Sequence, residues 1–240
     1  MDMVQNQKQE PMTETSPFRF ACHDALPCFT QCCRDVNIYL TPYDVLRLRK
    51  ALGGIGSAEF LGRYTRNFLA KMANIPVVQL QMNQETLYCP FVSNSGCTVY
   101  GNRPWACRMF PLDIASRGDS YRLIAGKERC MGLLERKSGT VADWIESQGV
   151  REYAELEEEY QRVVPERFIP GSPMNEGLGR ILFLAYDLDR FTEVLKDTRF
   201  LKFYDVDEEM LSRVRENDVE LLKLCFRYIR VQMNDLYQVL

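Results

Sequence analysis

Eight of the nine cysteines in this 240-residue chain lie between residues 22 and 130, and they fall into two blocks. The first block has the spacing Cys-x5-Cys-x3-Cys-Cys. The second has Cys-x7-Cys-x9-Cys, with one more cysteine behind it. The eight residues are Cys22, Cys28, Cys32, Cys33, Cys89, Cys97, Cys107 and Cys130. We interpret them as metal-binding thiolates around which the N-terminal half folds.

The surroundings of these cysteines favour metal ligands over ordinary core residues. A lone cysteine is usually a small buried hydrophobe, and this suits Cys225, which lies on an amphipathic segment far from the others. The adjacent pair Cys32-Cys33 instead has polar and charged neighbours, and Cys89 and Cys97 stand beside a proline and a glycine. An odd number of cysteines also argues against a closed disulfide framework.

The spacing leaves the identity of the metal open. Zinc knuckles usually show C-x2-C pairs, and this sequence has none. It also lacks the ferredoxin pattern of four closely spaced cysteines. Thiolates suit both zinc and iron–sulfur clusters. Eight sulfurs would satisfy two four-thiolate sites, and on steric grounds we expect Cys32 and Cys33 to serve different metals.

Other chemistries have little support in the sequence. The single histidine, His23, is interpreted as a surface residue in a loop, and one histidine gives poor support to Ser-His-Asp or Cys-His catalysis. There is no glycine-rich loop of a standard nucleotide-binding form, so a methyltransferase ranks low. Arg103 and Arg108 bracket Cys107, where they either donate hydrogen bonds to sulfur or form surface salt bridges.

The hydrophobic pattern predicts a mainly α chain with small β elements, that is, an α+β fold. We expect a disordered tail over 1–17, an irregular cysteine-rich metal-binding domain over 18–135, and a helical region over 136–240. Expected helices cover 42–52 (with Thr41 as N-cap), 57–73, 140–149, 150–164, 178–195, 207–215 and 218–236. Expected strands cover 36–40, 77–82, 86–88, 113–115 and 121–125, and 200–204 is expected as an apolar connector.

Composition and charge point to a cytoplasmic protein. The net charge is −3, which does not indicate nucleic acid or a membrane surface as a partner. The polar N-terminus has no apolar signal-peptide region, and no apolar run has the length of a membrane span. We expect the thiols to be reduced, as they are in the cytosol.

The two cysteine blocks resemble those of the YkgJ-type cysteine-cluster family, also called the CxxCxxCC zinc- or iron-chelating domain. The similarity rests on Cys28-x3-Cys32-Cys33-Arg34-Asp35, on Cys89-Pro90-Phe91, and on Gly96-Cys97-x2-Tyr100-x2-Arg103-Pro104-x2-Cys107-Arg108-x2-Pro111. It covers about residues 18–132. The first block departs from the usual C-x2-C-x2-C-C spacing, because five residues separate Cys22 from Cys28 and three separate Cys28 from Cys32.

The resemblance implies metal chelation by the eight cysteines. A similar cysteine domain occurs in flagellin lysine methylases, which suggests a cluster that supports a modification reaction. We therefore expect an iron–sulfur cluster of the 4Fe-4S kind that serves electron transfer or the modification of a protein partner. The alternative is a zinc-stabilised, non-catalytic module that binds a protein. Whether the chain is an enzyme is left open.

Overall fold

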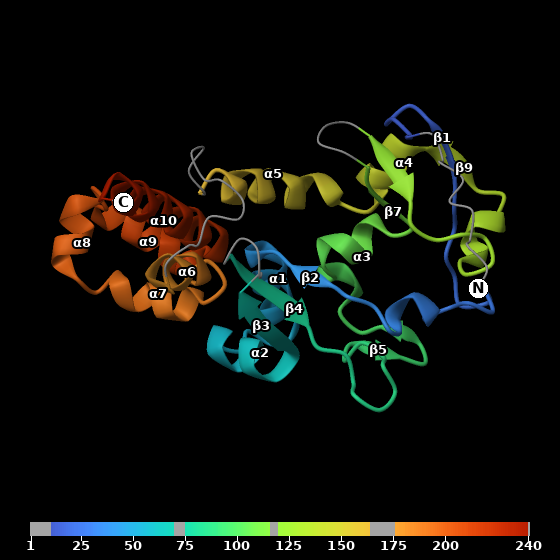
Figure 1. The fold of residues 1–240 in the computed structure, drawn as a ribbon, viewed down its shortest axis with the longest axis horizontal. Helices are drawn as coiled ribbons and strands as arrows, with labels where there is room; N and C mark the ends of the chain where they lie inside the picture. Colours follow the sequence, from blue (N-terminus) through green and yellow to red (C-terminus); the bar gives the residue numbers. More distant parts are fainter. Residues whose placement is uncertain (1–10, 70–74, 116–119, 164–175, 240) are drawn as a thin grey trace.

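The computed structural model describes residues 11–69, 75–115, 120–163 and 176–239. About 49% of the structure is helical and 15% is strand, in small separate sheets, which confirms the α+β prediction. Figure 1 shows the C-terminal helices at one end of the molecule. Strands β1 (Pro17–Arg19) and β9 (Ser138–Thr140), which are far apart in the sequence, lie at the other end, and helix α5 (Val150–Gln161) runs between the two ends.

The sheets are short and antiparallel, and they join segments that are distant in the sequence. Within the described residues, β1 (Pro17–Arg19) pairs with β9 (Ser138–Thr140), and the three-stranded sheet has the order β2 (Tyr39–Leu40), β4 (Pro76–Leu80), β3 (Thr65–Leu69). Two hairpins are β5 (Val92–Ser93) with β6 (Gly96–Cys97), and β7 (Leu112–Ile114) with β8 (Tyr121–Leu123). The predicted strands at 113–115 and 121–125 correspond to β7 and β8.

The helices of the first half are short, and the two that begin at residues 42 and 57 start where the sequence predicts. They are η1 (Gln31–Cys33), α1 (Pro42–Ala51), α2 (Ser57–Tyr64), η2 (Tyr100–Asn102), α3 (Trp105–Met109) and η3 (Met131–Leu134). Thr41 caps α1 as expected: its hydroxyl accepts the Asp44 N–H while the Asp44 carboxylate accepts the Thr41 N–H. This reciprocal capping box fixes the entry into α1.

The prediction of one helix over 57–73 is wrong after Tyr64, where α2 ends. Residues 65–69 form β3, which pairs with β4 from Thr65↔Leu80 to Leu69↔Pro76, and the last residues of the predicted helix lie outside the described part. Apolar residues such as Phe68 satisfied the helical period, but backbone pairing with β4 overrides that local pattern.

The second half is helical, as predicted. Its helices are α4 (Val141–Ser147), α5 (Val150–Gln161), α6 (Glu176–Phe183), α7 (Leu188–Val194), α8 (Thr198–Phe203), α9 (Glu208–Glu216) and α10 (Asp218–Val239). The single helix predicted over 178–195 is two, because Asp187 caps a new helix by accepting the Arg190 N–H. The connector predicted over 200–204 is mostly helix α8, which Asp197 caps.

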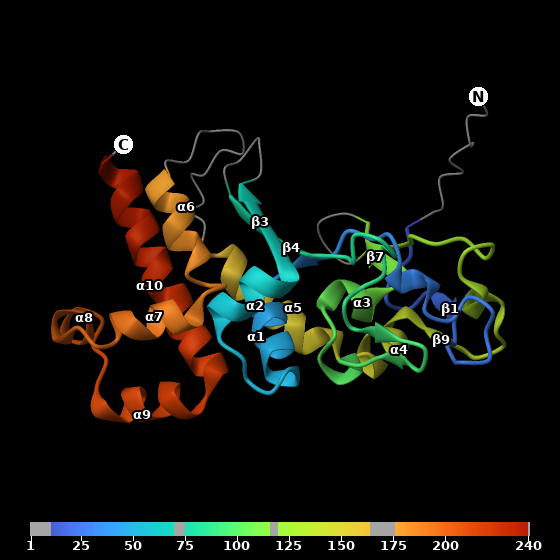
Figure 2. The ribbon, with the colours of Figure 1, turned by 90° about the horizontal axis from the view of Figure 1, so that it is seen from below.

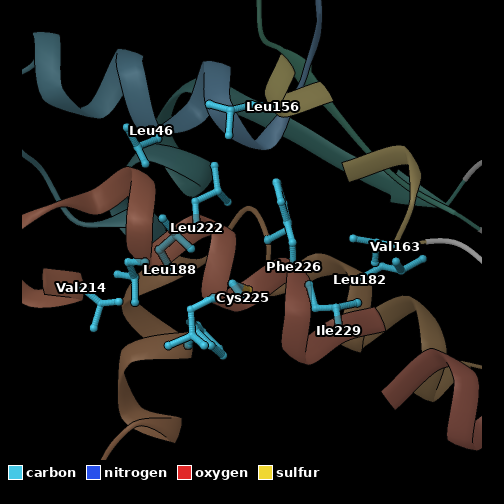
Figure 3. Close-up of a cluster of buried hydrophobic side chains, with 14 of the residues drawn as sticks. Leu46, Leu156, Val163, Leu182, Leu188, Val214, Leu222, Cys225, Phe226 and Ile229 are labelled. Atoms are coloured by element: carbon cyan, nitrogen blue, oxygen red, sulfur yellow. The ribbon is translucent and has the colours of Figure 1, made fainter. Parts of the chain in front are cut away.

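Three groups of buried apolar residues hold the chain together. The largest lies among the C-terminal helices and also takes in Tyr43 and Leu46 of α1. Figure 3 shows side chains of this group from α1, α5 and α10, with Cys225 among them. Cys225 is fully buried, which fits its interpretation as a core residue.

The packing crosses residue 135, where the sequence suggests a division into two parts. One buried group combines Phe18 and Met109 with Val141 and Ile145 of α4. Figure 2 shows α1, α2, β3 and β4 in the middle of the molecule, beside the C-terminal helices. These contacts do not mark a boundary at residue 135, and the division of the chain into two domains there stays a prediction.

The first described residues pair with later parts of the chain and do not form a free tail. Residues 1–10 of the tail expected over 1–17 lie outside the described part. Met12 forms an antiparallel bridge with Tyr121, and Pro17 begins β1. Among the described helices, none is long and apolar enough to cross a membrane.

Candidate metal centre

The eight cysteines of the two blocks are carried by loops and by very short elements. Cys22 and Cys28 follow β1, the adjacent pair lies in η1, Cys97 lies in β6, Cys107 lies in α3, and Cys130 precedes η3. All are free thiols; Cys22 and Cys32 are exposed, Cys130 is buried, and the others are intermediate.

Backbone contacts bring Cys22, Cys28 and Cys130 together, although up to 108 residues separate them in sequence. The Ala21 N–H donates to the Gly132 carbonyl at 3.1 Å, and the Met131 N–H donates to Sγ of Cys28 at 3.3 Å. A Cβ on Gly132 would lie 2.5 Å from the Ala21 carbonyl oxygen, so this approach requires glycine.

A second set of contacts joins the first cysteine block to the second. The Cys89 N–H donates to the Cys33 carbonyl at 2.8 Å, and the Asp35 N–H donates to the Leu87 carbonyl at 2.8 Å. Arg34 and Tyr88 form an isolated antiparallel bridge between these bonds. Cys33 and Cys89 are therefore opposite each other, and side chains at opposite positions of an antiparallel pair lie on the same face.

The β5–β6 hairpin, which carries Cys97, packs against the first cysteine block. Gly96 has a φ of +108°, a conformation open to glycine, and a Cβ there would lie 3.1 Å from the ring of Phe29. Phe29 comes from the first cysteine block, between Cys28 and Cys32. The glycine thus allows the aromatic ring to pack on the hairpin that carries Cys97.

Asp44 fixes helix α3, which carries Cys107. Its carboxylate is fully buried and accepts two backbone N–H groups, from Thr41 and from Trp105, each at 2.8 Å. Burial raises the pKa of Asp44 to about 6, although these hydrogen bonds oppose the shift. One carboxylate therefore ties the start of α1 to the start of α3.

Besides the Met131 N–H at Cys28, backbone N–H groups act on three more of the sulfurs. The donors are Phe91 to Cys89, Val99 to Cys97 and Gly132 to Cys130, in each case two residues after the cysteine. These bonds lower the thiol pKa because they favour the charged form. Such donors are what a thiolate ligand needs around its sulfur.

Burial and mutual repulsion act in the opposite direction. Burial raises the pKa of Cys89 and of Cys130 to about 11 in each case, and neighbouring thiols add to both shifts. The pKa of Cys107 is also raised, first by burial and then by Cys89. A bound cation would reverse this repulsion and release the protons.

Cys32 lies at the junction of the two groups of thiols. Burial raises the pKa of Cys22 in the first group and that of Cys97 in the second, and the proximity of Cys32 adds to both shifts. Its own pKa is raised, with the side-chain hydrogen bond to Cys33 as the first cause. The vicinal pair therefore connects two adjacent groups of sulfurs.

The eight thiols suit a soft metal, but their side chains do not surround a single point where one ion could bind. In the part of the chain that the structure describes, no three histidine, cysteine, aspartate or glutamate side chains stand in positions that could hold one metal ion. The eight thiols sit on loops and short elements and rotate about a single χ1 bond. The chain thus gathers the ligands, and coordination would require their side chains to turn.

Arg103 and Arg108 have neither of the roles expected from the sequence. Both side chains are 8% exposed. Arg108 donates to the carbonyl oxygens of Gly101 and Gln148, each at 2.6 Å, and Arg103 donates to the Tyr100 carbonyl at 2.7 Å. They hold the loop before α3 against the turn between α4 and α5, because five fixed N–H donors suit several carbonyl groups at once.

His23 lies at the surface. Its Nε2 is 3.8 Å from a carboxylate oxygen of Glu135, and 44% of its side chain is exposed. The position fits a surface residue. Two residues that hold the cysteine-bearing segments in place, Asp44 and Phe29, were not predicted from the sequence to have this role. The capping position of Asp44 at the start of α1 was the one signal in the sequence that pointed to either of them.

The fold and site together define a small α+β protein that gathers eight thiols between two segments of its N-terminal half. Residues 21–131 match the family model CxxCxxCC, described as a putative zinc- or iron-chelating domain. This match confirms the resemblance drawn from the cysteine blocks. Searches of curated proteins and of solved structures returned no match.

Proposed function

We propose that the cysteine domain binds iron as an iron–sulfur cluster, and that this centre transfers electrons or supports the modification of a protein partner. The observation that carries the proposal is the pairing of Cys33 with Cys89, which brings two blocks of thiols into one region. Hydrogen bonds from backbone N–H groups to sulfur support it, because such bonds set the potential of iron–sulfur centres.

The geometry supports two adjacent ligand sets. Each set would supply four thiolates and take one member of the vicinal pair. The first set is Cys22, Cys28, Cys32 and Cys130, and the second is Cys33, Cys89, Cys97 and Cys107. A bound cluster would supply one-electron chemistry, and the exposure of Cys22 and Cys32 would bring its edge near the surface.

The experiment uses protein purified without oxygen. We expect a brown solution whose visible absorbance bleaches with dithionite and which then gives a low-temperature paramagnetic signal. A colourless protein with stoichiometric zinc would overturn the proposal and favour the zinc-stabilised module instead. In that case, chelation should unfold the N-terminal half, because structural metal contributes folding free energy directly.

A further inference from the structure

The outer edge of β3 carries backbone groups that the sheet does not use. The Gln81 N–H donates to the Tyr64 carbonyl at 2.8 Å, which makes these two residues a hydrogen-bonded pair at the end of the β3–β4 ladder. Hydrogen-bonded pairs alternate along an antiparallel ladder. Asn67 and Leu69 therefore direct their N–H and C=O groups away from β4, and no described strand lies on that side.

A cavity adjoins this edge. Its volume is about 260 Å³, below the usual range for drug-sized ligands but suited to a single side chain. Leu69 lines it and is itself 45% exposed. The cavity lies between the β3–β4 sheet and the α6–α7 region; its lining residues are Asn67, Phe68, Leu69, Pro76, Gly179, Arg180, Phe183 and Arg190.

The charge of the region selects the kind of occupant. Arg190 lines the cavity, and the described residues of its lining include no acidic side chain. Arg66, exposed on β3 itself, adds a second cation. Two copies of this edge would bring like charges together, which disfavours pairing between copies of the chain. An acidic partner has no such penalty.

We propose that the β3 edge and this cavity bind an extended, acidic peptide segment of a partner protein. The segment pairs its backbone with Asn67 and Leu69, as in strand addition to an exposed sheet edge. One apolar side chain of the segment enters the cavity beside Leu69, and an acidic side chain lies against Arg190. This surface is separate from the cysteines, so the inference does not depend on metal binding.

The test uses the full chain and an array of capped seven-residue peptides in which aspartate or lysine alternates with one apolar residue type. We expect the chain to bind aspartate peptides and to ignore their lysine counterparts. Affinity for the best aspartate peptide, measured by fluorescence anisotropy, should fall at least tenfold in Asn67→Pro. Proline there removes an outward N–H but no bond of the β3–β4 ladder.

Arg190→Glu should also weaken binding at least tenfold, and the matched control Arg199→Glu, an exposed arginine on α8, should leave it unchanged. Circular dichroism and melting temperature establish that each variant is folded. The proposal is overturned if no aspartate peptide binds, if lysine peptides bind equally, or if both edge variants bind as well as the parent chain. It is also overturned if sedimentation shows a dimer that Asn67→Pro disrupts, because the occupant is then a second copy.

Discussion

The backbone N–H of Cys89 donates a 2.8 Å hydrogen bond to the carbonyl oxygen of Cys33, across 56 residues of sequence. This bond belongs to a short antiparallel pairing that also contains the Arg34–Tyr88 bridge. It places one cysteine of the vicinal pair opposite the first cysteine of the second block. The assignment of Cys33 and Cys89 to one ligand set rests on this relationship.

Two substitutions within one ligand set should therefore remove no more metal than one substitution does. Substitutions in different sets should have additive effects on the metal content. Cys33→Ser should remove about half of the bound metal. The double variant Cys33→Ser with Cys89→Ser should lose no more metal than Cys33→Ser alone, because loss of one ligand already releases the metal of that set. Cys22→Ser with Cys33→Ser should remove nearly all. Metal analysis of each variant measures this, with the core variant Cys225→Ala as a control that keeps its full content. Equal content in the two double variants would contradict the assignment.

Asp44 should make stability fall as pH rises. Its pKa is about 6 in the folded chain against an ordinary value of 3.8. The folded state therefore holds this proton more tightly, and stability is lost as pH rises between those values. A shift of this size corresponds to about 3 kcal/mol between pH 4 and pH 7. Urea unfolding at a series of pH values should show this loss in the parent chain relative to Asp44→Asn; parallel curves would argue against it.

Arg108 should contribute to stability through its carbonyl partners. Arg108→Ala leaves the part-buried carbonyl groups of Gly101 and Gln148 without this donor and should cost about 1–3 kcal/mol. Arg108→Lys should recover only part of the loss, because an ammonium group lacks the planar fork of a guanidinium. Free energies of unfolding in urea provide the measurement. The exposed control Arg199→Lys should stay nearly as stable as the parent chain, because surface substitutions usually have small effects. An Arg108→Ala chain as stable as this control would show the bonds to be dispensable.

Ser57 should couple the N-terminal half to α7. It is fully buried; its hydroxyl donates to Asp187 at 2.5 Å and its N–H donates to Asp189 at 2.7 Å. Ser57→Ala leaves the Asp187 carboxylate without this donor and should cost about 1–3 kcal/mol. Thermal and urea unfolding measure the loss, against the exposed control Ser212→Ala. A cost within the error of that control would show that this contact does not join the two halves.

Much of the local structure was predictable because its causes are local. Thr41 and Thr140 both start helices with a Thr-x-x-Asp capping box, and the box appears in the sequence. The turn from α2 into β3 was not predictable, because Phe68 satisfies a helical period and only pairing with the distant β4 decides otherwise.

The candidate site was predictable in its residue types but not in its arrangement. The cysteines stand out by number and by their glycine and proline neighbours. The pairing of Cys33 with Cys89 depends on tertiary structure, and nothing in the local sequence announces it. The same holds for Arg103 and Arg108, which both donate to Gln148, 45 and 40 positions away: Arg103 to its side-chain oxygen and Arg108 to its backbone carbonyl.

The most direct test of the central claim is the content of iron and acid-labile sulfide in protein purified without oxygen. The account predicts iron and sulfide in equal amounts, about four or about eight of each per chain for one or two cubane clusters. It also predicts that Cys225→Ala retains both. Zinc without sulfide in the parent chain, or no metal at all, would contradict it.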